Sequence, residues 1–193
     1  MVRLEYSQVI MLEVVSRLNE VIKRPSTGKT VVMKIMYILQ SFFGVKLGHS
    51  FSIYTYGPYA SSVSGELEDL IHSGYIEASI YRYQDSPAYE LKITEKGRTE
   101  LEQHTHKIEG DDGRIAKTLE LFGNKTAKEL ELDSTIIFLK NQYERNGWLK
   151  TDEDINDILA SVKDIKPHFS DEEIRDAYDS LQSDLQSAVP ALT

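Results

Sequence analysis

Few residues in this chain are spaced as catalysis or metal binding would require. Gly28-Lys29-Thr30 imitates the end of a phosphate-binding loop, but Lys23 occupies the position where that motif needs its first glycine. The side chains that could gather a metal ion are His104, His106, Glu109 and Asp111. Their spacing matches no recognised ligand pattern, so solvated side chains are the simpler interpretation.

The chain also lacks the patterns that mark a nucleophile or a cradle for a cofactor. We find no Ser/His/Asp signature, no glycine-rich phosphate cradle and no paired carboxylates in a setting that would raise a pKa. The sequence therefore predicts a protein that is not an enzyme, with no catalytic residue, no cofactor and no bound metal.

Two groups of aromatic residues are candidates for contact with a partner. Tyr54, Tyr56 and Tyr59 surround a Gly-Pro pair, and their ordinary role would be to pack the joint between a strand and a helix. The alternative is a binding or base-stacking platform, since tyrosine combines rigid contact area with a polar tip. Tyr81, Arg82 and Tyr83 fall near the tip of a predicted hairpin, where exposure is expected, and are the better candidates.

DNA reading is the second interpretation, and the predicted third helix weakens it. Reading base edges needs Arg, Lys, Asn or Gln, and residues 61–73 contain none of these four types but include Glu66, Glu68 and Asp69. Serines at the start of that helix could still donate to phosphate. The nucleic-acid candidates are Lys29, Lys34, Ser61, Ser62, Arg82 and Lys92, although scattered charges ordinarily mean a solvated surface.

Charge is distributed unevenly along the 193 residues. Residues 1–107 carry 12 basic and 12 acidic side chains, whereas residues 108–193 carry 10 and 19, which accounts for the whole net charge of -9. Such a C-terminal part should repel phosphate backbones. No cysteine and no apolar run approaching the length of a membrane span are present, so we expect a cytoplasmic protein without a membrane partner.

The first part of the chain has the pattern of three helices, a short strand and a hairpin. Apolar residues at helical spacing predict helices over about 5–23 and 29–43. Phe51 to Tyr56 alternates as a strand, and Gly57-Pro58 should turn the chain sharply into a third helix that Gly74 ends. A hairpin follows between 79–83 and 88–93. This order is typical of a winged helix-turn-helix, and we place that domain at 1–108.

The second part reads as helical. Residues 109–113, with two glycines around two aspartates, suggest a linker, and 114–187 form an acidic helical domain. Ser170 and Glu173 form a capping box, and Thr151 can cap the helix before it. The fold class is therefore mainly α with a small β-hairpin.

Several short motifs resemble one family. Lys34, Tyr37 and Gln40, the Tyr54 to Tyr59 segment, the Leu67 to Ile76 helix end and the Leu91 to Gly97 entry resemble the YwgA-like proteins of bacteria and archaea. These look related to the Panacea (SocA-like) antitoxin domains, which share a Lys-Leu-x-Tyr type helix and a Tyr-Gly-Pro turn. The similarity continues through Lys128 to Leu139 and Ile165 to Ile174. It implies a winged-helix-like fold, no known catalysis and, for the antitoxin branch, neutralisation of a partner protein.

These observations together favour a non-enzymatic regulatory protein that binds another protein, as an antitoxin-like neutraliser or a regulatory adaptor. The alternative is a DNA-binding transcriptional regulator. A homodimer is compatible with either function.

Overall fold

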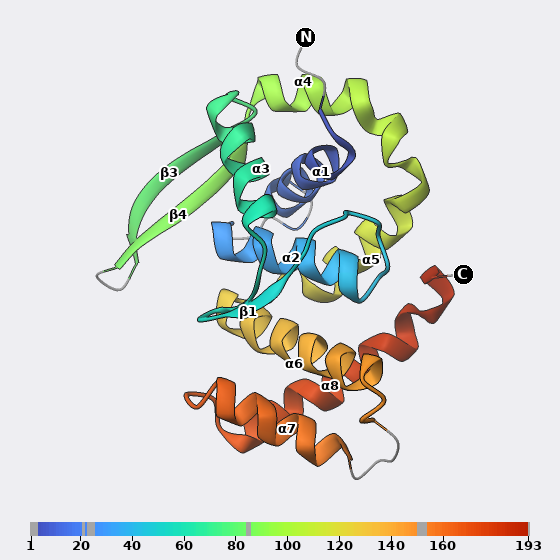
Figure 1. The fold of residues 1–193 in the computed structure, drawn as a ribbon. Helices are drawn as coiled ribbons and strands as arrows, with labels where there is room; N and C mark the ends of the chain where they lie inside the picture. Colours follow the sequence, from blue (N-terminus) through green and yellow to red (C-terminus); the bar gives the residue numbers. More distant parts are fainter. Residues whose placement is uncertain (1–3, 21, 23–25, 84–85, 150–153, 193) are drawn as a thin grey trace.

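The computed structural model describes residues 4–20, 22, 26–83, 86–149 and 154–192. Within these ranges, the side chains of 81–83, 86–87, 154, 185 and 187–192 are outside the description. The chain is mainly helical and has two antiparallel strand pairs, as Figure 1 shows. The prediction of a mainly α protein with a small β component is confirmed.

Helix α2 (Lys29–Ser41) lies at the centre of the molecule. Nine consecutive residues, from Val31 to Leu39, are buried, because this helix is surrounded by four others. They are α1 (Tyr6–Glu20), α3 (Ser61–His72), α5 (Asp112–Phe122) and α6 (Ala127–Arg145). Helix α3 buries Val63, Leu67 and Leu70. It ends before Gly74, as predicted, and the φ of Gly74 is 72°.

The longer strand pair projects from the helical body at the left of Figure 1. Strand β3 (Ile76–Tyr83) pairs with β4 (Ser86–Ile93) in the register Ile76↔Ile93 to Tyr83↔Ser86. The Asn19 amide fastens β4 to α1, since it donates to the Leu91 carbonyl (3.1 Å) and accepts from the Ile93 N–H (3.1 Å). The hairpin predicted after the third helix is confirmed.

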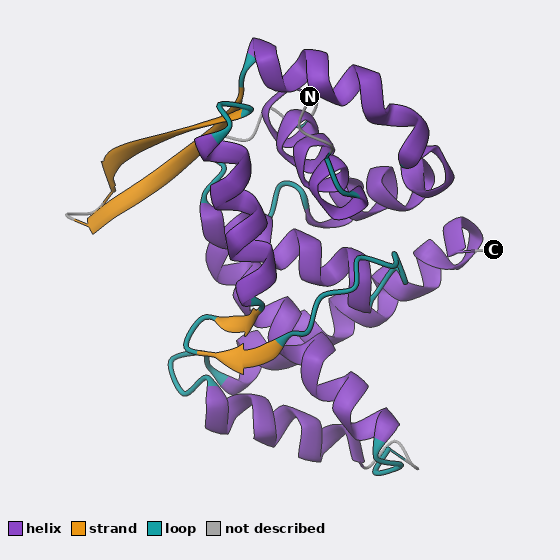
Figure 2. Ribbon diagram, turned by 45° about the horizontal axis from the view of Figure 1, so that its top comes forward, coloured by secondary structure: helices purple, strands orange, loops and turns teal. Residues whose placement is uncertain are grey.

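A second, shorter hairpin replaces the sharp turn predicted at Gly57-Pro58. Strand β1 (Ser52–Tyr54) pairs with β2 (Gly57–Tyr59), so Pro58 lies in a strand opposite Ile53 and α3 begins only at Ser61. Proline is acceptable here because a two-stranded pair consists of edge strands. Figure 2 shows the short hairpin in orange, apart from the longer ribbon.

The residues predicted as a linker are helical. After α4 (Glu95–His104) and η1 (Thr105–Lys107), residues 109–113 form η2 (Glu109–Asp111) and the start of α5 (Asp112–Phe122). Asp111 in this stretch accepts a hydrogen bond from the Tyr6 hydroxyl, which ties it to α1.

After α5, the acidic part continues with α6 (Ala127–Arg145), α7 (Asp154–Ile165) and α8 (Asp171–Leu192). The Ser170 capping box is confirmed: the Glu173 N–H donates to its hydroxyl (3.1 Å) and its own N–H to the Glu173 carboxylate (2.7 Å). Thr151 lies outside the described residues. One hydrophobic cluster runs from α1 to α8, because α6 packs on α2. The division into domains at 1–108 and 114–187 stays a prediction about folding units.

Candidate functional site

A groove lies between α2, α3 and the β1–β2 hairpin. Its volume is about 300 Å³. Three chain segments supply its walls, so only the folded chain forms it. The lining residues are Lys29, Thr30, Met33 and Lys34 from α2; Tyr54, Tyr56, Gly57 and Tyr59 from the hairpin; and Val63, Ser64 and Leu67 from α3. We call it the tyrosine groove.

The tyrosines stand at the surface of this groove. Tyr54 is 68% exposed, Tyr56 66% and Tyr59 37%, and the rings of Tyr54 and Tyr59 lie 5.8 Å apart. The expected packing role is therefore wrong for Tyr54 and Tyr56, because their rings are left to solvent. Neighbouring exposed aromatic rings are the side chains that most often anchor protein partners.

Gly57 allows the hairpin to press against α6. Its φ is +86°, a conformation that side chains rarely adopt. A Cβ at this position would also lie 3.0 Å from the Thr135 hydroxyl oxygen and 3.3 Å from the Glu131 carbonyl oxygen. Glycine is thus required both for the backbone turn and for the close approach of β2 to α6.

Lys34 holds the hairpin from beneath. It is 2% exposed, and its ammonium donates to the Pro58 carbonyl at 2.6 Å. Burial lowers the pKa of Lys34 to about 8; the Glu131 carboxylate opposes this shift and the Lys166 charge adds to it. The prediction of Lys34 as part of an exposed basic face for nucleic acid is wrong, because its side chain is buried at the bottom of the groove, where the ammonium is bonded to the Pro58 carbonyl.

A second buried lysine reaches the same hairpin from the acidic part of the chain. The Lys166 ammonium donates to the Thr55 carbonyl and forms an ion pair with Glu131 at 2.6 Å. His168 lies close to the same carboxylate, with 3.6 Å from Nε2 to the oxygen. The hairpin backbone is therefore fixed at two carbonyls by two ammonium groups.

The burial of these two lysines beneath the hairpin was not predicted, for a different reason in each case. Lys34 stands alone within the apolar run from Val31 to Leu39, and a lone charge in such a run indicates a buried, partnered side chain. The burial of Lys34 could therefore have been predicted from the sequence. Lys166 precedes a proline between two helices, and nothing in its neighbourhood distinguishes it from a solvated loop lysine.

The other nucleic-acid candidates offer little free positive charge. Lys29 forms an ion pair with Glu68 and lies over the Tyr89 ring at 4.4 Å, while Lys92 lies 3.3 Å from Glu90. Ser61 and Ser62 are exposed at the start of α3. The side chains of Tyr81, Arg82 and Tyr83 lie outside the described residues, although their backbone belongs to β3.

Ser7, His49 and Glu66 form a hydrogen-bond network that resembles a catalytic triad but cannot act as one. The Ser7 hydroxyl donates to the Glu66 carboxylate (2.7 Å) and therefore accepts from Nε2 of His49, also at 2.7 Å. Nδ1 of His49 is bonded to the Ser62 hydroxyl at 2.9 Å. Because the Ser7 proton is directed at Glu66 and Ser7 is buried, His49 cannot activate it toward a substrate. The network joins α1, α3 and the segment before β1.

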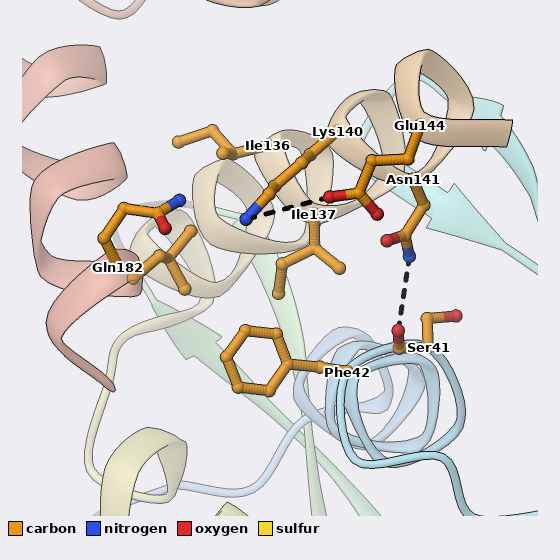
Figure 3. A pocket seen from close by; sticks show the side chains of 9 residues that line it. Ser41, Phe42, Ile136, Ile137, Lys140, Asn141, Glu144 and Gln182 are labelled. Carbon is orange, nitrogen blue, oxygen red and sulfur yellow. Dashed lines mark hydrogen bonds and ion pairs between the residues drawn. The ribbon is translucent and has the colours of Figure 1, made fainter. Parts of the chain in front are cut away.

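A smaller cavity of about 140 Å³ lies between the end of α2, α6 and α8, as Figure 3 shows. Asn141 donates to the Ser41 carbonyl across it (3.2 Å), and Lys140 lies 4.0 Å from Glu144 on the same helix. The Asn141 hydrogen bond joins α6 to α2, and the Lys140–Glu144 contact lies within α6. A third, polar hollow of about 290 Å³ between α2, α6 and residues 49–51 includes Arg145 and is open to solvent.

The other two sequence motifs, the Gly28-Lys29-Thr30 segment and the candidate metal ligands, form no site among the described residues. Gly28 precedes the first turn of α2, and the element before it is α1, so the strand of a phosphate-binding loop is missing there. Among the residues that the structure describes, no three His, Asp or Glu side chains come together as a metal site. The described helices also include none with the length and apolar character to cross a bilayer.

No protein-family model matches the chain, and no curated protein sequence matches it significantly.

Proposed function

We propose that this protein acts without catalysis, by binding another protein through the tyrosine groove. The observation that carries the proposal is the exposure of Tyr54, Tyr56 and Tyr59 on a hairpin whose backbone is fixed by two buried lysines. Aromatic side chains held in place lose little conformational entropy on binding. An antitoxin-like neutraliser or a regulatory adaptor would need such a rigid anchor.

The order of α1, α2, α3 and the β3–β4 ribbon supports a winged helix-turn-helix for the N-terminal part. In a DNA reader of that type α3 would enter the major groove. Helix α3 carries Glu66, Glu68 and Asp69 and has no Arg or Lys, so it would repel the phosphates on either side. This composition favours a protein partner over DNA.

The experiment is affinity purification of the tagged chain from the organism that encodes it. The test variant is Tyr54→Ala/Tyr56→Ala, and the matched control is Trp148→Ala, which removes another exposed aromatic ring remote in sequence from the groove. We expect one stoichiometric protein with the wild type and the control, and its loss with the double variant. The proposal is contradicted if the partner protein is recovered equally with the wild type, the control and the double variant. It is also contradicted if the wild type is recovered only as a free monomer.

A mobility shift with DNA from the protein's own promoter separates the two functions. We expect no shift at low salt, where electrostatic binding is strongest. A shift that weakens steeply as salt rises would instead support a transcriptional regulator.

A further inference from the structure

Lys34 lines the tyrosine groove, and two further charged side chains, Lys166 and Glu131, act on it from behind the groove wall. Lys34, Lys166 and Glu131 form a buried group with two ammonium ions and one carboxylate. The Glu131 carboxylate lies 2.6 Å from Lys166 and is therefore engaged by that lysine. Lys34 is left with a neutral partner, the carbonyl of Pro58.

Lys34 has hydrogen-bonding capacity that the described part of the chain does not use. An ammonium group has three N–H donors, and the Pro58 carbonyl is the one acceptor found for Lys34 among the described residues. A charged amine at such a buried position is costly unless an anion or several acceptors accompany it. The lowered pKa of Lys34 is the expression of this cost.

The rest of the groove suits an apolar side chain next to a negative group. Met33, Val63 and Leu67 supply apolar surface, and Thr30 and Ser64 supply hydroxyl groups. Among the described residues that line the groove, the charged ones are Lys29 and Lys34, and none is a carboxylate. Glu68 pairs with Lys29 beside the groove. The first turn of α2 also lines the groove, through Lys29 and Thr30. Gly28 provides no side-chain cap for this helix, so the N–H groups of the first turn of α2 favour a negative charge nearby.

We propose that the tyrosine groove binds a segment of the partner protein in which an aspartate or glutamate stands beside an apolar residue. The carboxylate accepts from Lys34 at the floor, and the apolar side chain packs on Met33, Val63 and Leu67 between the tyrosines. This inference rests on the proposed function and specifies its partner. A nucleic acid fits less well, because its row of phosphates would have to pass the carboxylates of α3, whereas a peptide can place one charge.

A random peptide library displayed on phage and selected on the full-length protein tests this chemistry. Peptides that bind the wild type and not Tyr54→Ala/Tyr56→Ala are groove binders. One of them is then synthesised in its acidic form and with each Asp or Glu replaced by Asn or Gln. Calorimetry measures both peptides against the wild type and against Lys34→Met.

We expect the amide peptide to bind the wild type at least about tenfold more weakly, the effect of losing a charged hydrogen bond. Both peptides should bind Lys34→Met equally. Equal binding of the two peptides to the wild type overturns the acidic partner, while their dependence on the tyrosines preserves the proposed function. If no selected peptide depends on the tyrosines for binding, both the acidic partner and the proposed function are overturned. If Lys34→Met fails to fold, the difference in affinity between the acidic and the amide peptide for the wild type still tests the proposal.

Discussion

The β1–β2 hairpin has three residues in each strand, and the β3–β4 ribbon has eight. Neither length would be stable alone in water, since two-stranded hairpins are marginal without further packing. The ribbon is fastened at the end nearest the helices, where Ile76, Leu91 and Ile93 are buried and Asn19 bonds to β4. Further out, Ile80 is 66% exposed.

The short hairpin is fastened along its length instead. Its carbonyls at Thr55 and Pro58 accept from buried lysines, and Gly57 lies against α6. The contrast teaches that strand length and rigidity are separate properties. A ribbon held at one end gives reach, whereas a hairpin held from beneath can present exposed rings in fixed positions, and this is why we place the binding surface there.

The largest effect should come from Lys166→Met. Removing one partner of a buried ion pair leaves the other charge uncompensated and typically costs about 3–5 kcal/mol. We expect a loss of that size in urea unfolding, with faster hydrogen exchange in β1–β2 than in β3–β4. The control Lys166→Met/Glu131→Met removes both charges and should recover part of the stability. A single variant as stable as the wild type would mean that the short hairpin does not depend on this lysine.

Gly57→Ala should cost about 2–4 kcal/mol, because it combines a strained positive φ with a contact of 3.0 Å to Thr135. Gly44→Ala is the matched control: Gly44 has a φ of 71° and open space around its Cβ position, so it isolates the backbone strain at about 1 kcal/mol. Thermal unfolding of both variants measures the difference. Equal losses would show that the close approach to α6 contributes nothing.

The lowered pKa of Lys34 makes the free energy of unfolding depend on pH, and the sign of this dependence can be predicted. Folding lowers the pKa of Lys34 from 10.5 to about 8, so between these values the unfolded chain binds a proton that the native protein lacks. The unfolding free energy must therefore rise with pH in this window. The charged groups acting on Lys34 are Glu131 and Lys166.

The measurement is urea unfolding of the wild type and Lys34→Met from about pH 7.5 to about pH 9.5. We expect the stability of the wild type relative to the variant to increase by about 1–2 kcal/mol. The range stops below the titration of Tyr37, whose pKa burial raises to about 12. A constant or falling difference would contradict a buried, proton-linked lysine.

The smallest effect should come from the ribbon. Ile80→Ser replaces an exposed side chain away from the anchored end of β3, so we expect a change within about 0.5 kcal/mol in thermal unfolding. Binding of groove-dependent peptides should also be unchanged. A clear loss of either would show that the outer ribbon is part of the core or of the binding surface.

Much of the architecture could be predicted from the sequence because its signals are local. The third helix was predicted to end at Gly74, and α3 does end just before this glycine, whose φ is positive. Alternation predicted the β3–β4 ribbon. The short hairpin was missed because Pro58 after Gly57 is an ordinary helix-start signal. Helix α6, against which β2 packs, begins far later in the chain, at Ala127, so no local signal reports it.

The candidate site was predicted in part. Tyr54, Tyr56 and Tyr59 were singled out by residue type, yet their exposure could not be decided, since it depends on which face of the hairpin meets α6. Lys34 was taken for a surface charge although its apolar neighbours indicated burial. Lys166 could not have been predicted to contact Thr55, because nothing local links the two residues.

What the sequence determined alone is the set of helices, the ribbon and the excess of negative charge after residue 107, since periodicity, capping and charge are properties of neighbouring residues. Tertiary structure alone decided that two lysines from distant segments meet beneath the short β1–β2 hairpin. The physical reason is that a buried ammonium group must find its acceptors wherever the packed chain brings them, and that place has no signature along the sequence.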